Sequence, residues 1–224
     1  MSQATRQELI DTHGFDADRI MVTPEVANVT PKSPSNDRIF ERLALEGPYV
    51  LSVGTIEPRK NQVRLVQAFV QAGAALAEHA LVLAGIPGWG QEQVQTAIDN
   101  LGVSHRVTLT GKVTNLDLAA LYSRADVFAI PSLYEGFGIP LLEAMSFGIP
   151  AVAGSTPALA ELAGETALLV EPTDTDALAG KLAQLATDKA LRERLSTAAR
   201  QRAAGYSWEE TTRLTLQAYR RAAE

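Results

Sequence analysis

The sequence predicts an α/β fold in which helices cover both faces of a six-stranded parallel sheet. Two observations support this prediction. Short apolar runs recur along the chain, at residues 49–53, 80–84, 107–110, 127–130, 151–153 and 167–170. Segments with helical spacing separate these runs, and strands that alternate with helices build a parallel sheet buried on both faces. A doubly wound sheet with strand order 3-2-1-4-5-6 is therefore expected.

Helices are expected between the strands and after the last of them. The intervening helices are predicted at residues 62–76, 91–101, 116–123, 141–147 and 158–163, and three closing helices at residues 174–187, 189–204 and 208–222. Two of the closing helices begin with a capping box, in which two side chains satisfy free backbone N–H groups: Thr173 with Asp176, and Ser207 with Glu210.

The first 36 residues follow a different pattern. A short helix is expected at residues 2–13 and a brief strand at residues 20–23. The prolines that follow, Pro24, Pro31 and Pro34, indicate a linker. A single strand needs a pairing partner. This segment is therefore interpreted as the tail of another domain.

The composition argues against several classes of function. A net charge of −6 argues against nucleic acid or an anionic membrane surface as the main partner, because both favour a basic protein. There are no cysteines, which excludes disulfides, thiolate metal sites and cysteine nucleophiles. No apolar run approaches the roughly 18 residues of a transmembrane segment, and no signal-peptide pattern opens the chain. A soluble, cytoplasmic protein is expected.

Metal binding is not expected, although two Asp-x-Asp strings occur. Asp16 and Asp18 lie in the atypical N-terminal segment, and Asp174 and Asp176 fall where a helix is predicted to begin. The three histidines are scattered, without the spacing of metal ligands.

The stretch from residue 127 to residue 150 has the features of an anion-binding site. A short strand is followed by a glycine-rich turn, and Pro140 suits the first turn of a helix. Glu135 precedes this helix and Glu143 is placed in its first turn, so both carboxylates are expected to face the helix N-terminus. The backbone amides of residues 136–139 should point there too, and a helix start favours an anion. A phosphate-bearing ligand with hydroxyl groups fits this combination.

Two cations are expected to face this stretch across one crevice. In the predicted strand order the winding reverses between the first and fourth strands, and ligands bind at the carboxyl ends of the strands beside such a switch point. The first strand leads into Gly54 and then into Arg59 and Lys60, which suit a diphosphate as a forked donor and a point charge. Taken alone, the cations would also fit a solvated turn, and Glu143 would also fit the helix dipole. Their shared place at the switch point favours a ligand-binding role.

At these residues the chain resembles the donor-binding half of GT-B fold glycosyltransferases, specifically the large retaining group called family 4. Four strings carry the resemblance in the right order: VGTIEPRKN (53–61), VTLTGKV (107–113), ADVFAIPSLYEGFGIPLLEAMSFGIPAVA (125–153) and ALLVEP (167–172). The string YSWEETTRLTLQAYRR (206–221) also looks like that family's closing helix. The resemblance covers essentially residues 38–221 and implies a Rossmann-like donor-binding domain.

The resemblance implies a role for each matching position. Arg59 and Lys60 would hold the donor diphosphate and stabilise the leaving group, and Glu135 would contact the transferred sugar, so these three form the expected catalytic set. Glu143 would bind the ribose hydroxyls. Lys112 and Val113 would line the pocket for the nucleotide base. The other expected donor-binding residues are Gly54, the turn residues Gly136, Phe137 and Gly138, and Leu142. The family generally needs no metal, and no other cofactor is implied.

The implied reaction transfers a hexose from a GDP- or UDP-linked sugar to an acceptor hydroxyl, with retention at the anomeric carbon. We expect this chain to represent the family's donor-binding half without the N-terminal acceptor domain. Residues 1–36 are accordingly interpreted as a remnant of that domain with the linker, residues 37–206 as the nucleotide-sugar-binding domain and residues 207–224 as the closing helix. Turnover would then need an acceptor domain in cis or in trans, which would also offer a peripheral contact with a membrane. The alternative is a stand-alone nucleotide-sugar-binding or regulatory module without catalysis. A third interpretation is an epimerase or phosphorylase of similar fold, but the catalytic and cofactor-binding residues of those enzymes are not recognisable in this sequence.

Overall fold

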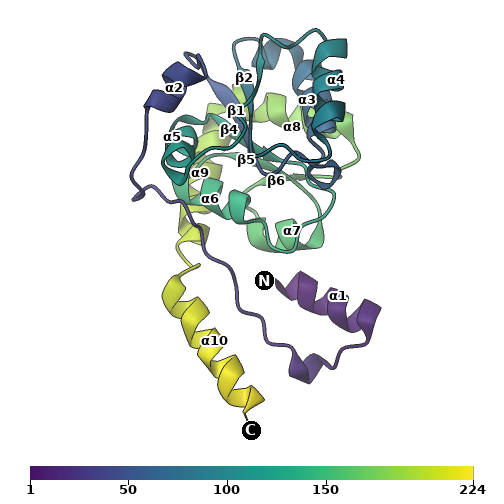
Figure 1. Cartoon of the computed structure of the whole chain (residues 1–224), viewed down its shortest axis with the longest axis vertical. Helices are drawn as coiled ribbons and strands as arrows, with labels where there is room; N and C mark the ends of the chain where they lie inside the picture. Colours follow the sequence, from purple (N-terminus) through teal and green to yellow (C-terminus); the bar gives the residue numbers. More distant parts are fainter. Residues whose placement is uncertain (224) are drawn as a thin grey trace.

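The computed structural model describes residues 1–223 and contains the predicted sheet. Six parallel strands pair in the order β3-β2-β1-β4-β5-β6 (Figure 1). Their bounds are β1 Tyr49–Val53, β2 Ala80–Ala84, β3 Val107–Leu109, β4 Val127–Ile130, β5 Ala151–Gly154 and β6 Leu168–Val170. The predicted fold class and strand order are confirmed.

Alternate residues of the strands enter two hydrophobic cores, one on each face of the sheet. On β1, Leu51 packs into one core and Val50 into the other, and their partners on β4, Phe128 and Val127, follow the same alternation. All four side chains are fully buried. Because strand side chains alternate between faces, burial on both sides explains why the strands read as continuous apolar runs.

Helices cover both faces of the sheet (Figure 1). One core includes residues from α3 (Gln62–Gln71), α4 (Gln91–Asn100) and α8 (Thr175–Thr187). The other includes residues from α2 (Arg38–Arg42), α5 (Asn115–Arg124), α6 (Ile139–Phe147) and α7 (Pro157–Ala163), and α9 (Lys189–Ala203) contributes to both. The remaining helices are α1 (Gln3–His13), α10 (Trp208–Ala222) and three short 3-10 turns at Ala17–Arg19, Pro58–Lys60 and Gly73–Leu76. Over residues 1–223, none of the helices combines the length and apolar character needed to span a bilayer.

Local backbone geometry explains the main differences from prediction. The helix expected to reach residue 76 ends at Gln71, because Gly73 takes a positive φ of 58° and opens a 3-10 turn. Residues 20–23, predicted as a strand, are not paired in the sheet. The sequence reading also missed α2, a helix of 5 residues.

Both predicted capping boxes need correction. The helix α8 is capped by Asp174, whose carboxylate accepts a backbone N–H of the first turn at 2.8 Å, so Thr173 lies outside the helix. At the start of α10 the Ser207 hydroxyl accepts from the backbone N–H of Glu210 at 3.2 Å, as predicted. The Glu210 carboxylate, however, pairs with Arg213 at 2.6 Å instead of returning to the cap.

The helix α1 is held over the glycine-rich turn that precedes α6. The hydroxyls of Ser2 and Thr5 donate to the carbonyl of Gly136 at 2.8 and 2.9 Å. On α7, the Glu161 carboxylate accepts two backbone N–H groups from the first turn of α1 at 2.9 and 2.8 Å. A carboxylate at a helix N-terminus is electrostatically favourable. These bonds fix α1 beside α7 (Figure 1).

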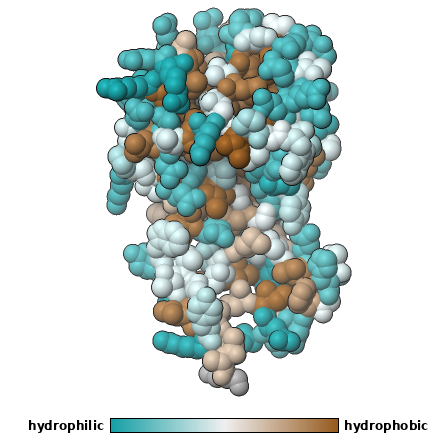
Figure 2. All heavy atoms as spheres, in the orientation of Figure 1, coloured by the Kyte–Doolittle hydropathy of each residue, from teal (hydrophilic) through white to brown (hydrophobic). Residues whose placement is uncertain are grey.

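The helix α10 extends away from the α/β body, and none of its described residues is buried (Figure 1). Trp208, Leu216 and Tyr219 are 63%, 49% and 69% exposed. Figure 2 shows apolar residues scattered over this narrower part of the molecule. The Thr211 hydroxyl donates to the carbonyl of Pro24 at 2.9 Å, which ties α10 to the segment that follows α1.

Asn61 holds three loops together at the carboxyl edge of the sheet. Its Nδ2 donates to the carbonyl of Pro131, after β4, at 2.9 Å and to that of Pro172, after β6, at 2.7 Å. Its Oδ1 accepts from Arg64 at 2.8 Å. Asn61 is buried and has a φ of 61°, a left-handed conformation that Asn and Gly tolerate best. The chain is thereby fixed immediately after Lys60.

Replacing Asn61 with Ala should lower the free energy of unfolding by about 2–4 kcal/mol, because two buried carbonyls lose their donor and a residue with a Cβ must keep a left-handed backbone. Asn61→Gly should cost about 0.5–1 kcal/mol less, since it loses the same bonds without the strain. Urea unfolding measures both, with the exposed Asn100→Ala as a control. A loss below about 1 kcal/mol in Asn61→Ala would show that Asn61 does not brace the loops.

Candidate functional site

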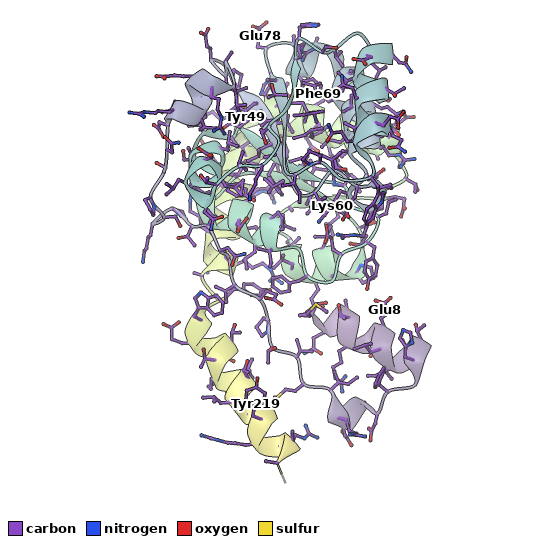
Figure 3. The ribbon with its side chains drawn as sticks, in the orientation of Figure 1. Glu8, Tyr49, Lys60, Phe69, Glu78 and Tyr219 are labelled. Atoms are coloured by element: carbon purple, nitrogen blue, oxygen red, sulfur yellow. The ribbon has the colours of Figure 1, made fainter. Side chains whose placement is uncertain are left out.

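The structure brings Arg59, Lys60 and Glu135 together at the switch point between β1 and β4. Lys60 Nζ donates to Glu135 Oε1 at 2.6 Å, and Arg59 Nη1 donates to Glu135 Oε2 at 2.9 Å. The two loops are also joined through the backbone, where Leu133 N–H donates to the carbonyl of Arg59 at 2.8 Å. Figure 3 shows Lys60 in the lower part of the α/β body, on the side that α1 approaches. The carboxylate therefore links the loops that follow two adjacent strands.

Glu135 is held in its ionised form. Burial opposes ionisation, but the Lys60 ammonium, the hydroxyl of Ser132 at 2.8 Å and the Arg59 guanidinium outweigh it, so the pKa of Glu135 lies below its ordinary value. The side chains of Glu135 and Lys60 are only 8% and 12% exposed, whereas that of Arg59 is 40% exposed. Arg59 also donates to Glu57 at 2.6 Å. Of the two cations, Arg59 is the one more open to a ligand.

Gly54 makes room for the Lys60 side chain at the end of β1. Its φ is +149°, and an added Cβ would lie 3.2 Å from Lys60 Cε. A side chain at this position would crowd the end of the Lys60 side chain and require it to shift. The predicted site residue Gly54 thus has a local steric role in addition to any contact with a ligand.

The glycine-rich turn presents free backbone donors. Among the hydrogen bonds of residues 1–223, none uses the N–H groups of residues 136–139 as donors. These groups lie at the start of α6, a helix of 9 residues. Gly138 has a φ of +104°, and an added Cβ would meet Leu159 Cδ2 at 2.6 Å, so only glycine fits. Free N–H groups at a helix N-terminus favour an anion such as phosphate.

Glu143 does not lie where it was predicted. The helix α6 begins at Ile139, so Glu143 falls in the second turn rather than the first. Its carboxylate is buried and faces the linker, where Oε1 accepts the N–H groups of Asn28 and Val29 at 3.2 Å each. Its Oε2 accepts from the Tyr122 hydroxyl at 2.9 Å. The expectation that both glutamates face the helix N-terminus is therefore wrong for Glu143.

The surroundings of Glu143 leave part of its acceptor capacity free. Burial raises the pKa of Glu143 above its ordinary value, and the hydrogen bonds from Tyr122, Val29 and Asn28 only partly offset this effect. Burial, and then the nearby Glu143 carboxylate, also raise the pKa of Tyr122, which keeps the phenol a donor. A carboxylate oxygen accepts about two hydrogen bonds. Oε1 already has two, whereas Oε2 has one and retains room for another donor.

The other predicted donor-binding residues lie in two places, two of them in the loop after β3 and two in a hydrophobic core. Lys112 is exposed and Val113 half-buried, and both follow β3, which lies two strands from β1. A strand spacing of about 4.8 Å places them about 10 Å from the end of β1. Leu142 and the ring of Phe137 are buried in a hydrophobic core, where the Phe137 ring packs edge-on against Tyr206. Phe137 therefore offers its backbone N–H, and Leu142 supports α6 from inside the core.

Sequence reasoning missed several residues that complete the site. Ser132 is the second residue after the end of β4, in a loop at the carboxyl edge where ligands bind in parallel sheets, so this signal was present in the sequence. Tyr122 lies on another helix, 21 residues before Glu143, and no spacing rule connects the two. In the described part of the chain, no group of three or more His, Cys, Asp or Glu side chains is arranged to hold a metal ion.

Comparison with known proteins identifies the family. Residues 35–202 match the family described as "Glycosyl transferases group 1". The chain belongs to this family. It is 34% identical, over 98% of its length, to O-antigen chain mannosyltransferase B from Escherichia coli, of which it covers 59%.

Two of the solved structures that resemble this group 1 chain illustrate the likeness. Sucrose-phosphate synthase from Thermosynechococcus elongatus matches with a TM-score of 0.76 and 30% identity, over 88% of this chain and 52% of that one. HepE from Anabaena, solved with UDP and glucose, matches with a TM-score of 0.82 and 22% identity, over 99% of this chain and 61% of that one. The second likeness concerns the fold alone. The group 1 chain spans between 52% and 61% of the length of these three proteins.

Glu143→Gln should change the pH dependence of stability. Because its pKa is raised in the folded state, Glu143 favours folding most below its unfolded pKa, and this contribution is lost as the pH rises through the folded pKa. The Gln variant does not titrate, so its stability relative to wild type should improve by on the order of 1 kcal/mol between about pH 4 and pH 7. Urea unfolding across this range measures the difference. The variant Glu165→Gln, at an exposed position, serves as the control. If the free energy of unfolding of Glu143→Gln and of wild type changed with pH in parallel, the raised pKa of the buried Glu143 would be contradicted.

Proposed function

We propose that this chain is the donor-binding half of a retaining hexosyltransferase of family 4 that uses a nucleoside-diphosphate sugar. In the transfer, the bond from the anomeric carbon to the diphosphate oxygen breaks and a bond to the acceptor hydroxyl oxygen forms. The hydroxyl proton leaves with the nucleoside diphosphate. The mannosyltransferase relative favours mannose as the hexose, and the donor is GDP- or UDP-linked.

The observation that carries this proposal is the meeting of Arg59 and Lys60 with Glu135 beside the free N–H groups of residues 136–139. Lys60 uses one of its three N–H groups on Glu135, so two remain for a diphosphate. The turn amides supply further donors in fixed positions. Donors aimed at the leaving diphosphate stabilise the charge that develops as the bond to the sugar breaks.

The rest of the donor extends along the carboxyl edge of the sheet. We assign the base to Lys112 and Val113 after β3, and the sugar to Glu135 and the turn of Gly136 to Gly138 after β4. The ribose diol is assigned to Glu143, through the acceptor capacity left on Oε2. No metal is assigned, because unused N–H groups on Lys60 and on residues 136–139, at a helix start, can satisfy the diphosphate.

A further domain is proposed to complete the cleft, in cis or in trans. The exposed Trp208, Leu216 and Tyr219 of α10 support this part of the proposal. Large exposed apolar side chains grouped on one element are typical of surfaces that another protein covers. Residues 37–206 would then be the donor-binding domain and residues 207–224 the closing helix.

Calorimetry with GDP and UDP should show binding that weakens at least about tenfold in Arg59→Ala and in Lys60→Ala, because each removes a charge-assisted bond to the diphosphate. EDTA should leave the affinity unchanged. Lys189→Ala is the matched control, since Lys189 on α9 is 81% exposed and, within residues 1–223, its one ion pair is with Glu193 at 3.8 Å. Unchanged affinity in both site variants would remove the phosphate assignment, and a requirement for Mg²⁺ would revive a metal role.

The ribose assignment is tested by comparing ligands with and without a ribose. Glu143→Gln should weaken binding of GDP or UDP about threefold to tenfold, because an ionised acceptor is replaced by a neutral one, and should spare inorganic pyrophosphate. Competition calorimetry at one pH measures both ligands. An equal loss of affinity for the nucleotide and for pyrophosphate would show that Glu143 supports the structure of the turn and does not bind the ribose.

A further inference from the structure

A cavity of about 770 Å³ lies between α1, the loop after β4 and the start of α7. Its walls include Gln7, Glu8 and Asp11 from α1, Tyr134 and Glu135 from the loop, and Thr156 at the start of α7. Figure 3 shows Glu8 on α1, on the side of the molecule where this helix meets the α/β body. We infer that this cavity binds the acceptor, and that the part of the acceptor held there is a neutral saccharide without phosphate. The inference rests on the proposed function, because it takes Glu135 as the sugar end of the donor.

The position of the cavity follows from the strand order. The loops after β3, β1 and β4 are assigned to the base, the diphosphate and the transferred sugar, and they follow one another along the sheet edge. The next strand in this direction is β5, which leads into α7. The cavity lies there, and Glu135 is part of its wall. An acceptor in this cavity would therefore meet the donor at its sugar end and away from its base.

The chemistry of the walls suits a sugar ring. Tyr134 is 47% exposed, and its hydroxyl donates to Glu8 Oε2 at 2.8 Å, which fixes the ring between the loop and α1. A fixed aromatic ring offers a flat apolar surface with a polar edge, and the C–H face of a pyranose is apolar while its rim carries hydroxyls. Gln7 adds amide groups that match hydroxyls.

The charge of the cavity selects against an anionic acceptor. Glu8, Asp11, Glu135 and Glu161 all line it, and no Lys or Arg side chain does. A phosphate group here would meet four carboxylates without a Lys or Arg side chain in the lining, which is repulsive at short range. A neutral saccharide avoids this cost.

The test uses two sugars that differ in charge. Methyl α-mannopyranoside and mannose 6-phosphate are titrated by saturation-transfer NMR into the full chain, with saturating GDP or UDP to fill the nucleotide site. The neutral sugar should bind in the millimolar range and at least about fivefold more tightly than the phosphate. Failure of wild type to bind the neutral sugar, or equal binding of the two sugars, would overturn the inference.

Tyr134 variants locate the binding site. Tyr134→Ala should weaken binding of the neutral sugar about fivefold or more, whereas Tyr134→Phe, which keeps the ring and loses the bond to Glu8, should weaken it less than about twofold. A purely structural role, tying α1 to the loop, would make the two losses equal. Tyr219→Ala on α10 is the matched control. Thermal unfolding of each variant shows whether it is folded, and unchanged binding in folded Tyr134→Ala would place the sugar elsewhere.

Two further arms separate this inference from the proposed function. The double variant Glu8→Gln, Asp11→Asn should tighten binding of mannose 6-phosphate about threefold, because it removes two carboxylates, while the neutral sugar stays within about twofold. An unchanged phosphate affinity would contradict the charge argument. Nucleotide binding should be the same in Tyr134→Ala as in wild type. Loss of nucleotide binding in wild type would overturn the donor site, whereas loss of sugar binding alone would overturn only the acceptor cavity.

Discussion

The site depends on the carboxylate of Glu135. Its three side-chain partners come from the loops after β1 and β4, which are adjacent in the sheet although Lys60 and Glu135 lie 75 residues apart in sequence. The depressed pKa keeps this buried group ionised, and a buried charge without partners would be strongly destabilising. The ion pairs therefore fix the start of the turn whose N–H groups, at residues 136–139, donate to no other described residue. Gly54, which leaves space for Lys60, and Asn61, which anchors the chain after it, support the same contact.

Local charge alone does not attract an anion to this edge. Arg59 and Lys60 are balanced by Glu57 and Glu135, all within hydrogen-bond distance of a partner in the group. This edge of the sheet differs from an ordinary charged surface because it holds unused hydrogen-bond donors in fixed positions. These donors are N–H groups of Lys60 and the backbone N–H groups of residues 136–139, which lie at the start of the nine-residue helix α6. Preorganised donors of this kind bind a ligand without a free-energy cost for rearrangement. Arg59, whose side chain is 40% exposed, is more open to solvent than Lys60 and Glu135.

The sequence predicts the sheet and its strand order from local apolar runs, and it predicts the meeting of Arg59, Lys60 and Glu135 from short strings after two of the strands. The surroundings of Glu143 cannot be predicted in this way. A helix start at Ile139 moves Glu143 into the second turn, and the burial of Val29 in a hydrophobic core draws the linker against α6. The position of the linker is a long-range packing effect with no local signal. The walls supplied by α1 are hidden for the same reason, since Ser2 and Thr5 reach Gly136 across more than 130 residues of sequence.

The linker contact has a thermodynamic consequence under the proposed function. Glu143 accepts from the linker through Oε1 and, when a donor is bound, accepts from the ribose through Oε2, so a single carboxylate joins the segment that precedes the α/β body to the nucleotide. Hydrogen bonds to an ionised carboxylate are stronger than those to a neutral carboxyl, and burial raises the pKa of Glu143 and so opposes its ionisation. A ribose hydroxyl that donates to Oε2 partly offsets the effect of burial and favours the ionised form that also binds the Asn28 and Val29 amides. Because linkage is reciprocal, a linker docked on α6 then favours the donor by the same free energy as the donor favours the docked linker.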